Sequence, residues 1–384
     1  MKTKSFSNNF YLLLISLVSA MGGLLFGYDW VVIGGAKPFY EIFFAIENSP
    51  GMQGWVMGSA ILGCLIGVTI AGSLSDKYGR KPLMIIAAIT FTVSAIGTGA
   101  VNDLNWFIFY RIFGGIGIGI ASNLSPMYIA EVSPSHVRGK FVSINQLTIV
   151  LGILAAQFVN WLIAEPVVPG ENILETWNGQ MGWRWMFWAE VVPSALFFIL
   201  IFFIPESPRW LATKLQYGKA ENILSHIGGK EYAKKEIESI KTDISAAFQQ
   251  WCGLYVVFNY AQEIFAAAGY GVSDILFNIV VTGVTNVIFT FVGMYTVDKL
   301  GRRSLMLFGA SGLAIIYIIM GICYYLNITG MAVLIMVVLA IACYAMTLAP
   351  VTWVVLSEIF PNRIRGMAMA VSTFSLWVAC FVLT

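Results

Sequence analysis

Charged residues are scarce in this sequence. Asp, Glu, Lys and Arg together make up 11% of its 384 residues, while hydrophobic residues make up 58% and the mean hydropathy is +0.80. A water-soluble chain has roughly 25% charged and about 45–50% apolar residues. This chain therefore has too few polar side chains to cover a surface that faces water, which excludes a soluble globular protein. We expect a lipid bilayer around it and no nucleic acid among its partners.

Patterns for catalysis, nucleotide binding and metal binding are also missing. The sequence has only two histidines, and its five cysteines form no CxxC pair. It contains no Walker sequence and no arrangement typical of a hydrolytic triad. The glycine-rich run at 114–119 lies in the middle of an apolar stretch with no strand before it, which favours close helix packing over nucleotide binding. We therefore expect no enzyme, no metal and no cofactor.

Long apolar runs are what the sequence has in abundance. About 20 apolar residues are needed for a helix to cross roughly 30 Å of hydrocarbon. Because backbone groups in lipid must be hydrogen-bonded within the span, runs of this length predict helices and not strands. Eleven spans are expected, at 10–35, 54–74, 83–101, 106–130, 143–164, 184–204, 246–268, 275–297, 305–326, 331–357 and 367–384.

The distribution of basic residues predicts the orientation. If the amino terminus lies in the cytoplasm and the loops alternate between the two sides, 19 of the 22 Lys and Arg residues face the cytoplasm. The three others are Lys37, Arg111 and Arg184. An excess of basic residues in cytoplasmic loops is the usual bias of membrane proteins. The expected location is a multi-pass membrane protein with a cytoplasmic amino terminus.

Two charged motifs each occur twice, in the same order. Asp76-Lys-Tyr-Gly-Arg80 recurs as Asp298-Lys-Leu-Gly-Arg302, and a Glu-x-x-Pro motif at Glu131 recurs at Glu358. A single copy could be an ordinary basic turn at the membrane face, but paired recurrence indicates two homologous halves. We interpret the clusters as a cytoplasmic gate that closes when acids and arginines of different helices pair. Its expected members are Asp76, Arg80, Glu131, Arg138, Asp298, Arg302, Glu358 and Arg365.

A polar segment separates the two halves. Residues 205–245 are rich in Lys and Glu, with a spacing that suggests short amphipathic helices. The predicted organisation is a six-helix bundle at 1–204, a cytoplasmic linker at 205–245 and a second bundle at 246–384.

Taken together, these motifs resemble the sugar porter family of the major facilitator superfamily, and most of all its bacterial xylose/proton symporters. The resemblance extends over almost the whole chain. It is carried by Gly23 to Asp29, Asp76 to Lys81, Arg111 to Gly117, Met127 to Glu131, Arg138 to Lys140, Pro205 to Trp210, Phe248 to Gln250, Asp298 to Arg303 and Ser357 to Gly366.

The resemblance implies an all-α membrane protein with the major facilitator fold, made of two pseudo-symmetric six-helix halves. That fold has twelve spans, whereas this chain stops within the eleventh. The approach to Phe248 is also shorter than in the family, so the start of the seventh span and part of the linker are expected to be missing. Either the chain is a shortened homologue or its numbering runs across absent residues.

Three ionisable residues lie well inside expected spans: Asp29, Arg111 and Glu190. Charges in such positions are costly and usually mark a transport route or a proton relay. A buried Asp–Arg pair that only ties two helices together is the alternative. The resemblance implies that Asp29 alternately binds a proton and pairs with Arg111, while Glu190 tunes Arg111. A proton would then be the coupling ion.

Sugar recognition needs amides and hydroxyls for hydrogen bonds and an aromatic face for the ring. Any single amide could instead form an interhelical hydrogen bond. By resemblance, the sugar site consists of Gln146, Gln249, Gln250, Asn286 and Trp353, with Trp377 nearby. The chain departs from the xylose symporters at Ile153, Tyr255, Asn259 and Leu376, which leaves the identity of the sugar open.

The function that the resemblance implies is import of a monosaccharide or related polyol by proton symport through alternating access. Two alternatives stay open: a proton-independent sugar facilitator, and a transport-incompetent sugar sensor or remnant. The expected location is the inner membrane of a bacterium, and the expected state is a monomer.

Overall fold

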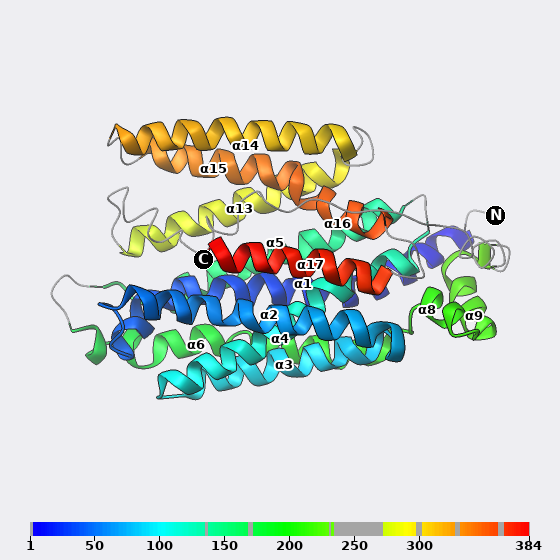
Figure 1. Ribbon diagram of the computed structural model, residues 1–384, viewed down its shortest axis with the longest axis horizontal. Coiled ribbons are helices and arrows are strands. Elements are labelled where there is room, and N and C mark those ends of the chain that lie inside the picture. Colours follow the sequence, from blue (N-terminus) through cyan, green and yellow to red (C-terminus); the bar gives the residue numbers. More distant parts are fainter. Residues whose placement is uncertain are drawn as a thin grey trace.

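The computed structural model describes residues 3–134, 137–167, 172–229, 232–233, 272–296, 302–326, 331–359 and 365–383. Regular structure within these ranges is helical. Long helices lie side by side along the length of the molecule, and two short helices, α8 (Pro208–Thr213) and α9 (Tyr217–Gly228), lie at one end (Figure 1).

The amino-terminal half begins with five long helices, each built on one of the expected apolar runs. The polar ends agree with ordinary helix signals: Asp103 accepts hydrogen bonds from the backbone amides of Asn105 and Trp106, and Pro50 occupies the first helical position of its helix. The five helices are α1 (Thr3–Phe43), α2 (Pro50–Tyr78), α3 (Arg80–Ala100), α4 (Leu104–Val132) and α5 (Arg138–Ile163).

The sixth expected span is not one continuous helix. A turn at Ala189 and Glu190 separates α6 from α7. Pro193 supplies a reason, because it has no N–H to donate to the carbonyl of Ala189. The turn places Glu190 at a helix break inside the span. The segments in order are η1 (Ile173–Glu175), η2 (Asn178–Gly182), α6 (Trp183–Trp188), α7 (Val191–Leu200) and η3 (Ile201–Phe203).

The remaining helices follow the polar segment. The expected span at 331–357 is divided at Thr347, three residues before Pro350, which again removes one backbone donor. The expected span at 246–268 lies outside the described residues. The helices are α8 (Pro208–Thr213), α9 (Tyr217–Gly228), α13 (Val272–Thr296), α14 (Arg302–Tyr325), α15 (Met331–Met346), α16 (Leu348–Ile359) and α17 (Arg365–Leu383).

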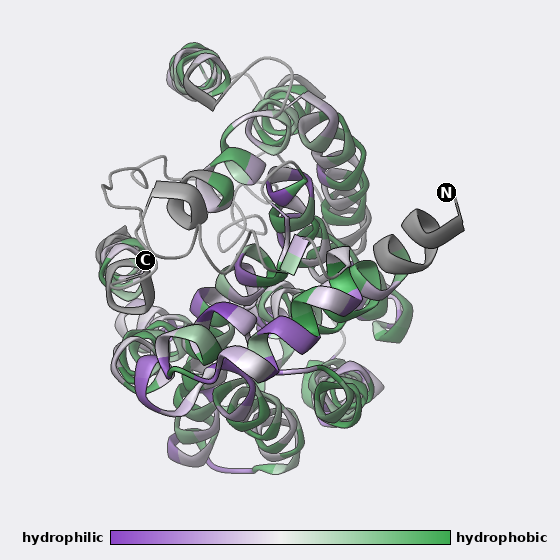
Figure 2. Cartoon of the chain, turned by 90° about the vertical axis from the view of Figure 1, so that its right-hand side faces the viewer, coloured by the Kyte–Doolittle hydropathy of each residue, from purple (hydrophilic) through white to green (hydrophobic). Residues whose placement is uncertain are grey.

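Nine helical segments among the described residues are long and apolar enough to cross a bilayer, and a tenth apolar helix at Met369–Val378 is shorter. Seen from the end that carries α8 and α9, hydrophilic residues gather on the segments nearest the viewer and hydrophobic residues dominate the spans around them (Figure 2). An all-α membrane protein, as predicted, accounts for both features.

Glycines allow the helices of the first half to approach closely. A Cβ added at Gly27 of α1 would collide with the backbone of α5 at Ile149, and one added at Gly63 of α2 would collide with the backbone of α4 at Ile112. Small residues are the usual means of close helix packing in lipid. Contacts between the halves run through α2 with α17, and through α5 with α13 and α16. Helices α16 and α17 also contact α4, which carries several of the polar residues described next.

Candidate functional site

The first element of the site is a buried ion pair between α1 and α4. The Arg111 guanidinium donates from Nη1 to Oδ1 of Asp29 and to the Asp29 backbone carbonyl, the latter at 3.4 Å. Both residues are 2% exposed. The guanidinium also lies 5.9 Å from the centre of the Phe187 ring on α6. An unpaired charge at this depth would be strongly unfavourable, so each group depends on the other.

Glu190 adds a second acid to this pair. It is 2% exposed and interacts electrostatically with both Asp29 and Arg111. Among the described residues, neither Glu190 Oε1 nor Asp29 Oδ2 has a hydrogen-bond partner. Two carboxylates and one guanidinium leave one negative charge, and a single added proton makes the trio neutral. The arrangement can therefore hold or release one proton inside the bundle.

Two tryptophans of the second half donate hydrogen bonds to the first half. Trp353 on α16 donates from its indole nitrogen to Oε1 of Gln146 on α5, at 2.9 Å. Trp377 on α17 donates to the hydroxyl of Ser122 on α4, at 3.4 Å. All four side chains are buried. Ser122 was not predicted as a site residue. It lies three helical turns from Arg111 on α4, and this spacing indicates that the two residues share a face of the helix.

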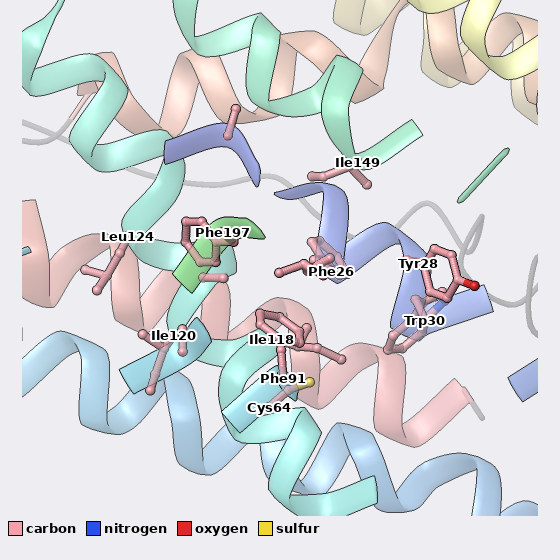
Figure 3. Close-up of a cluster of buried hydrophobic side chains, with 14 of the residues drawn as sticks. Phe26, Tyr28, Trp30, Cys64, Phe91, Ile118, Ile120, Leu124, Ile149 and Phe197 are labelled. Carbon is pink, nitrogen blue, oxygen red and sulfur yellow. The ribbon is translucent and has the colours of Figure 1, made fainter. Parts of the chain in front are cut away.

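An aromatic wall, defined here as Phe26, Trp30 and Trp377, joins α1 to α17. The ring of Trp377 lies 5.5 Å from that of Phe26 and 5.2 Å from that of Trp30, centre to centre. Figure 3 shows Phe26 and Trp30 on α1 within the buried apolar cluster. Trp30 follows Asp29 in the chain, so consecutive positions of α1 supply one member of the wall and one member of the ion pair. Phe26 and Trp30 were not predicted, although their i, i+4 spacing places them on one face of the helix.

The other predicted sugar residues are placed in part. Asn286 on α13 is 2% exposed, and its Oδ1 has no hydrogen-bond partner in the described part of the chain. Helix α13 packs along α5, the helix that carries Gln146. Gln249 and Gln250 lie outside the described residues. The structure thus brings Gln146, Trp353, Trp377 and Asn286 to the contact between the two halves.

Buried amides on α4 and α5 were missed by the sequence analysis. Asn123, Asn145 and Gln157 are each at most 3% exposed. In the described ranges, the side-chain oxygen and nitrogen of Asn123 and of Asn145 have no hydrogen-bond partner. The same is true there of Oε1 of Gln157. Such groups are rare in protein interiors unless they line a polar cavity. Their positions on the same helices as Arg111 and Gln146 were the available signal in the sequence.

A charge network at the α8/α9 end contains three of the predicted gate residues. Arg80 at the start of α3 binds Glu131 on α4 through Nε and Nη2, both at 3.0 Å. Its Nη1 donates to Asp76 Oδ1 at 3.1 Å and to the Ser75 carbonyl at 2.7 Å. The bidentate geometry is the strong form of an arginine–carboxylate contact. Asp76, Arg80 and Glu131 therefore come together within the first half.

Glu206, in the polar segment after the sixth span, was not predicted but supports this network. Its carboxylate accepts hydrogen bonds from the backbone amides of Arg80 at 3.0 Å and Lys81 at 3.2 Å, at the amino terminus of α3, and from its neighbour Ser207 at 2.8 Å. Burial raises the pKa of Glu206 above its ordinary value, and these N–H donors limit the rise. A carboxylate at a helix amino terminus also suits the helix dipole.

The other predicted gate residues are described only in part. Arg138 at the start of α5 donates from Nη2 to the Ser133 carbonyl, at 3.5 Å. Asp298 lies outside the described residues. The side chains of Arg302, Glu358 and Arg365 also lie outside them, although their backbones belong to α14, α16 and α17. The gate role of all eight residues stays a prediction.

Comparisons with known proteins place this arrangement in a family. The chain matches the sequence model of the family described as "Sugar (and other) transporter" over residues 15–247 and 244–384. It is 37% identical to the D-xylose-proton symporter of Escherichia coli K12, over 97% of this chain and 84% of that protein. It is 36% identical to the arabinose-proton symporter of Bacillus subtilis 168, over 98% and 85%.

Solved structures agree with the sequence match. The major facilitator superfamily proton:xylose symporter XylE, bound to 6-bromo-6-deoxy-D-glucose, superimposes with a TM-score of 0.89 at 36% identity, covering 98% of this chain and 88% of that one. An inward-open structure of the xylose transporter XylE from E. coli superimposes with a TM-score of 0.78 at 36% identity, covering 97% of this chain and 89% of that one.

The family resemblance and the fold class predicted from the sequence are thus confirmed, although the number of spans is not fixed by the described residues. The apolar helices and the matched transporters show an integral, multi-pass membrane protein that is not an enzyme. The chain belongs to the sugar transporter family of the major facilitator superfamily.

Proposed function

We propose that this protein imports a monosaccharide or related polyol together with a proton, by alternating access. The observation that carries the proposal is the buried ion pair between Asp29 of α1 and Arg111 of α4, two helices that also contact Trp377 of the second half. The relatives that match over nearly the whole chain include xylose and arabinose proton symporters.

Proton binding would act on the contact between the halves through two helices. Protonation of Asp29 removes the charge that holds Arg111, so α1 and α4 lose their strongest link at that depth. Each of these helices also contacts Trp377 of the second half, α1 through Phe26 and Trp30 and α4 through Ser122. A change in the Asp29–Arg111 pair is therefore transmitted directly to a residue of the proposed sugar chamber.

Sugar binding would replace contacts that the halves make with each other. The hydrogen bond between Trp353 and Gln146 joins two of the predicted sugar ligands. A sugar hydroxyl can accept from the indole N–H and donate to the amide oxygen at the same time. Gln146, Asn286, Trp353, Trp377 and the predicted Gln249 and Gln250 would then surround the substrate.

The direction of transport follows from the proton gradient, and the proposed orientation decides which side the Arg80 network faces. With the amino terminus in the cytoplasm, the Arg80 network closes or opens the cytoplasmic side, and the protein lies in a bacterial cell membrane as a monomer. The coupling ion is the proton, whose passage through the membrane potential contributes about 2.3 kcal/mol per 100 mV. This corresponds to about 50-fold accumulation of a neutral sugar per 100 mV.

Purified protein in proteoliposomes tests the proposal. Labelled D-xylose, L-arabinose and D-glucose would be offered with an inward proton gradient, with and without a protonophore. We expect accumulation that the protonophore abolishes and that the Asp29→Asn variant lacks, while sugar exchange at equal concentrations continues in that variant.

Two outcomes would contradict symport. Uptake that is indifferent to both the protonophore and the substitution would indicate a facilitator, and one relative, from Zymomonas mobilis, is described as a glucose facilitated diffusion protein. Binding without uptake would indicate a sensor, an interpretation that the matched relatives do not support.

A further inference from the structure

Four residues lie along one face of α5, and the first and the last of them contact helices of the second half. Gln146, Val150, Ile153 and Gln157 follow at i, i+4, i+7 and i+11, a spacing that places them on the same side of a helix. Gln146 contacts Trp353 on α16 through its amide oxygen. Gln157 lies about 16 Å farther along the axis, at about 1.5 Å per residue, on the side away from α8 and α9.

Gln157 contacts α13 at a glycine. A Cβ added at Gly283 would collide with the Gln157 amide oxygen, so this oxygen occupies the space that a side chain on α13 would fill. Gln157 is 3% exposed. The amide therefore lies between the two halves, at a seam that must rearrange when access alternates.

The polar atoms at this seam have unused hydrogen-bonding capacity. Within the described residues, neither Oε1 of Gln157 nor Oδ1 of Asn286, three positions from Gly283, has a partner. The hydroxyl of Thr282, the neighbour of Gly283, already donates to the Ile279 carbonyl at 2.7 Å. Two buried amide oxygens without donors are unfavourable unless a donor reaches them from elsewhere.

Another buried amide on the same helix has a different role. Asn160 donates to the Val32 carbonyl of α1 at 3.1 Å, and Gly35 of α1 packs against its side chain. This amide faces the interior of the first half and joins two of its helices. Gln157, one turn away, faces α13 instead. Asn160 therefore offers a matched control, because it is a buried amide on the same helix whose hydrogen bond runs to α1, within the first half.

We propose that Gln157 is a further substrate-binding residue, which accepts a hydrogen bond from a sugar hydroxyl in an outer subsite between α5 and α13. Gly283 leaves space for the Gln157 amide oxygen, and Asn286, three positions farther along α13, would line this subsite from the second half. The inference rests on the proposed sugar transport and adds a residue that determines specificity. The separation of Gln157 from Gln146 means that the sugar meets Gln157 on the outer side of the chamber, under the proposed orientation.

An apolar replacement separates this role from simple packing. If Gln157 only fills space against Gly283, Gln157→Leu fills the same space without a buried polar atom, and KM should stay unchanged. If Gln157 binds the sugar, Gln157→Leu raises KM for uptake about three- to ten-fold, the effect of one lost hydrogen bond, with little change in the maximal rate. Protonophore sensitivity should remain as in the wild type.

Three companion measurements make the result specific. Asn160→Ala should lower the melting temperature of the purified protein and leave KM within about twofold. Gly283→Ala should raise KM as Gln157→Leu does, and the double variant should be no worse than either, because both changes remove the same contact. A series of deoxy sugars should include one whose KM is equal in wild type and Gln157→Leu, which identifies the hydroxyl that Gln157 binds.

The outcomes separate this inference from the proposed function. If the wild type transports sugar and Gln157→Leu has the same KM for every sugar in the series, the inference is wrong and the transport proposal stands. If Gln157→Leu reduces the amount of folded protein, Gln157→Met, which keeps the chain length and flexibility, provides the same comparison. If the wild type takes up and binds no sugar at all, the proposed function fails.

Discussion

Two arginines are buried against carboxylates in the first half, and they are held very differently. Arg80 makes two hydrogen bonds to Glu131, one to Asp76 and one to a backbone carbonyl. Arg111 contacts Asp29 through Nη1 alone, and in the described structure its Nε has no hydrogen-bond partner. Arg80 is thus the more firmly held of the two arginines, and under the proposed function a single proton on Asp29 would release Arg111.

The surroundings of the two pairs strengthen this contrast. Arg80 begins α3, whose first amides bind Glu206, so the guanidinium and its helix are both anchored. Arg111 lies in the first third of α4, two turns inside the helix, with a second acid nearby and an aromatic ring as its neighbour. A many-point network tolerates small movements, whereas a one-point pair is lost when Asp29 is protonated. The first arrangement suits a gate and the second a proton switch.

The largest expected effect on stability comes from breaking the many-point network. Arg80→Ala leaves Glu131 buried without its bidentate partner, which should lower the free energy of unfolding by about 3–5 kcal/mol. Thermal unfolding of the purified protein in detergent would measure the change. Lys77→Ala, at an exposed position nearby, is the control and should cost less than about 0.5 kcal/mol. If Arg80→Ala and Lys77→Ala lowered the free energy of unfolding equally, the Arg80 network would not be the firmly held pair.

The one-point pair should respond in the opposite way, with a large effect on coupling and a smaller one on stability. Asp29→Asn keeps the shape of the side chain, and Glu190 remains to compensate the charge of Arg111. Accumulation of sugar should fall from about 50-fold per 100 mV to none, while the melting temperature falls less than in Arg80→Ala. Comparison of uptake and thermal unfolding in the same preparations measures both. Greater unfolding in Asp29→Asn than in Arg80→Ala would show that Asp29 is structural.

An intermediate effect is expected at the tryptophan that joins the halves. Trp353→Phe keeps an aromatic ring but removes the N–H that donates to Gln146. The loss of one hydrogen bond to the sugar should raise KM about three- to ten-fold. Gln146→Leu should produce a similar rise. If Trp353→Phe leaves KM unchanged while Gln146→Leu raises it, the indole N–H serves only the contact between the halves.

The smallest effect concerns the acid that supports the Arg80 network. Since burial raises the pKa of Glu206, the folded protein holds this proton more tightly than the unfolded chain does. The free energy of unfolding should therefore fall as pH rises from the ordinary pKa of a glutamate, about 4.3, through the raised value. Glu206→Gln should flatten this dependence by about 1 kcal/mol or less, as measured by thermal unfolding across that range. A steeper dependence in the variant would contradict the assignment.

Particular residues show how far the sequence alone could go at the site. Asp29, Arg111 and Glu190 were predicted because ionisable residues are rare in spans, and the structure places all three together. Gln157 and Trp30 were missed, because amides and aromatic residues are common on helices that merely pack. Only the rotation of α1 and α5 about their axes decides that these side chains face α17 and α13.

The sequence by itself determined a membrane protein of apolar helices in two related halves, because hydrocarbon thickness and the need to satisfy backbone hydrogen bonds leave few alternatives. The tertiary structure decided the rest. It set which carboxylates Arg80 and Arg111 bind and which amides of α5 face α1 or α13. Successive residues on a helix point about 100° apart, so a small rotation of one helix changes every partner, and only packing against the neighbouring helices fixes that rotation.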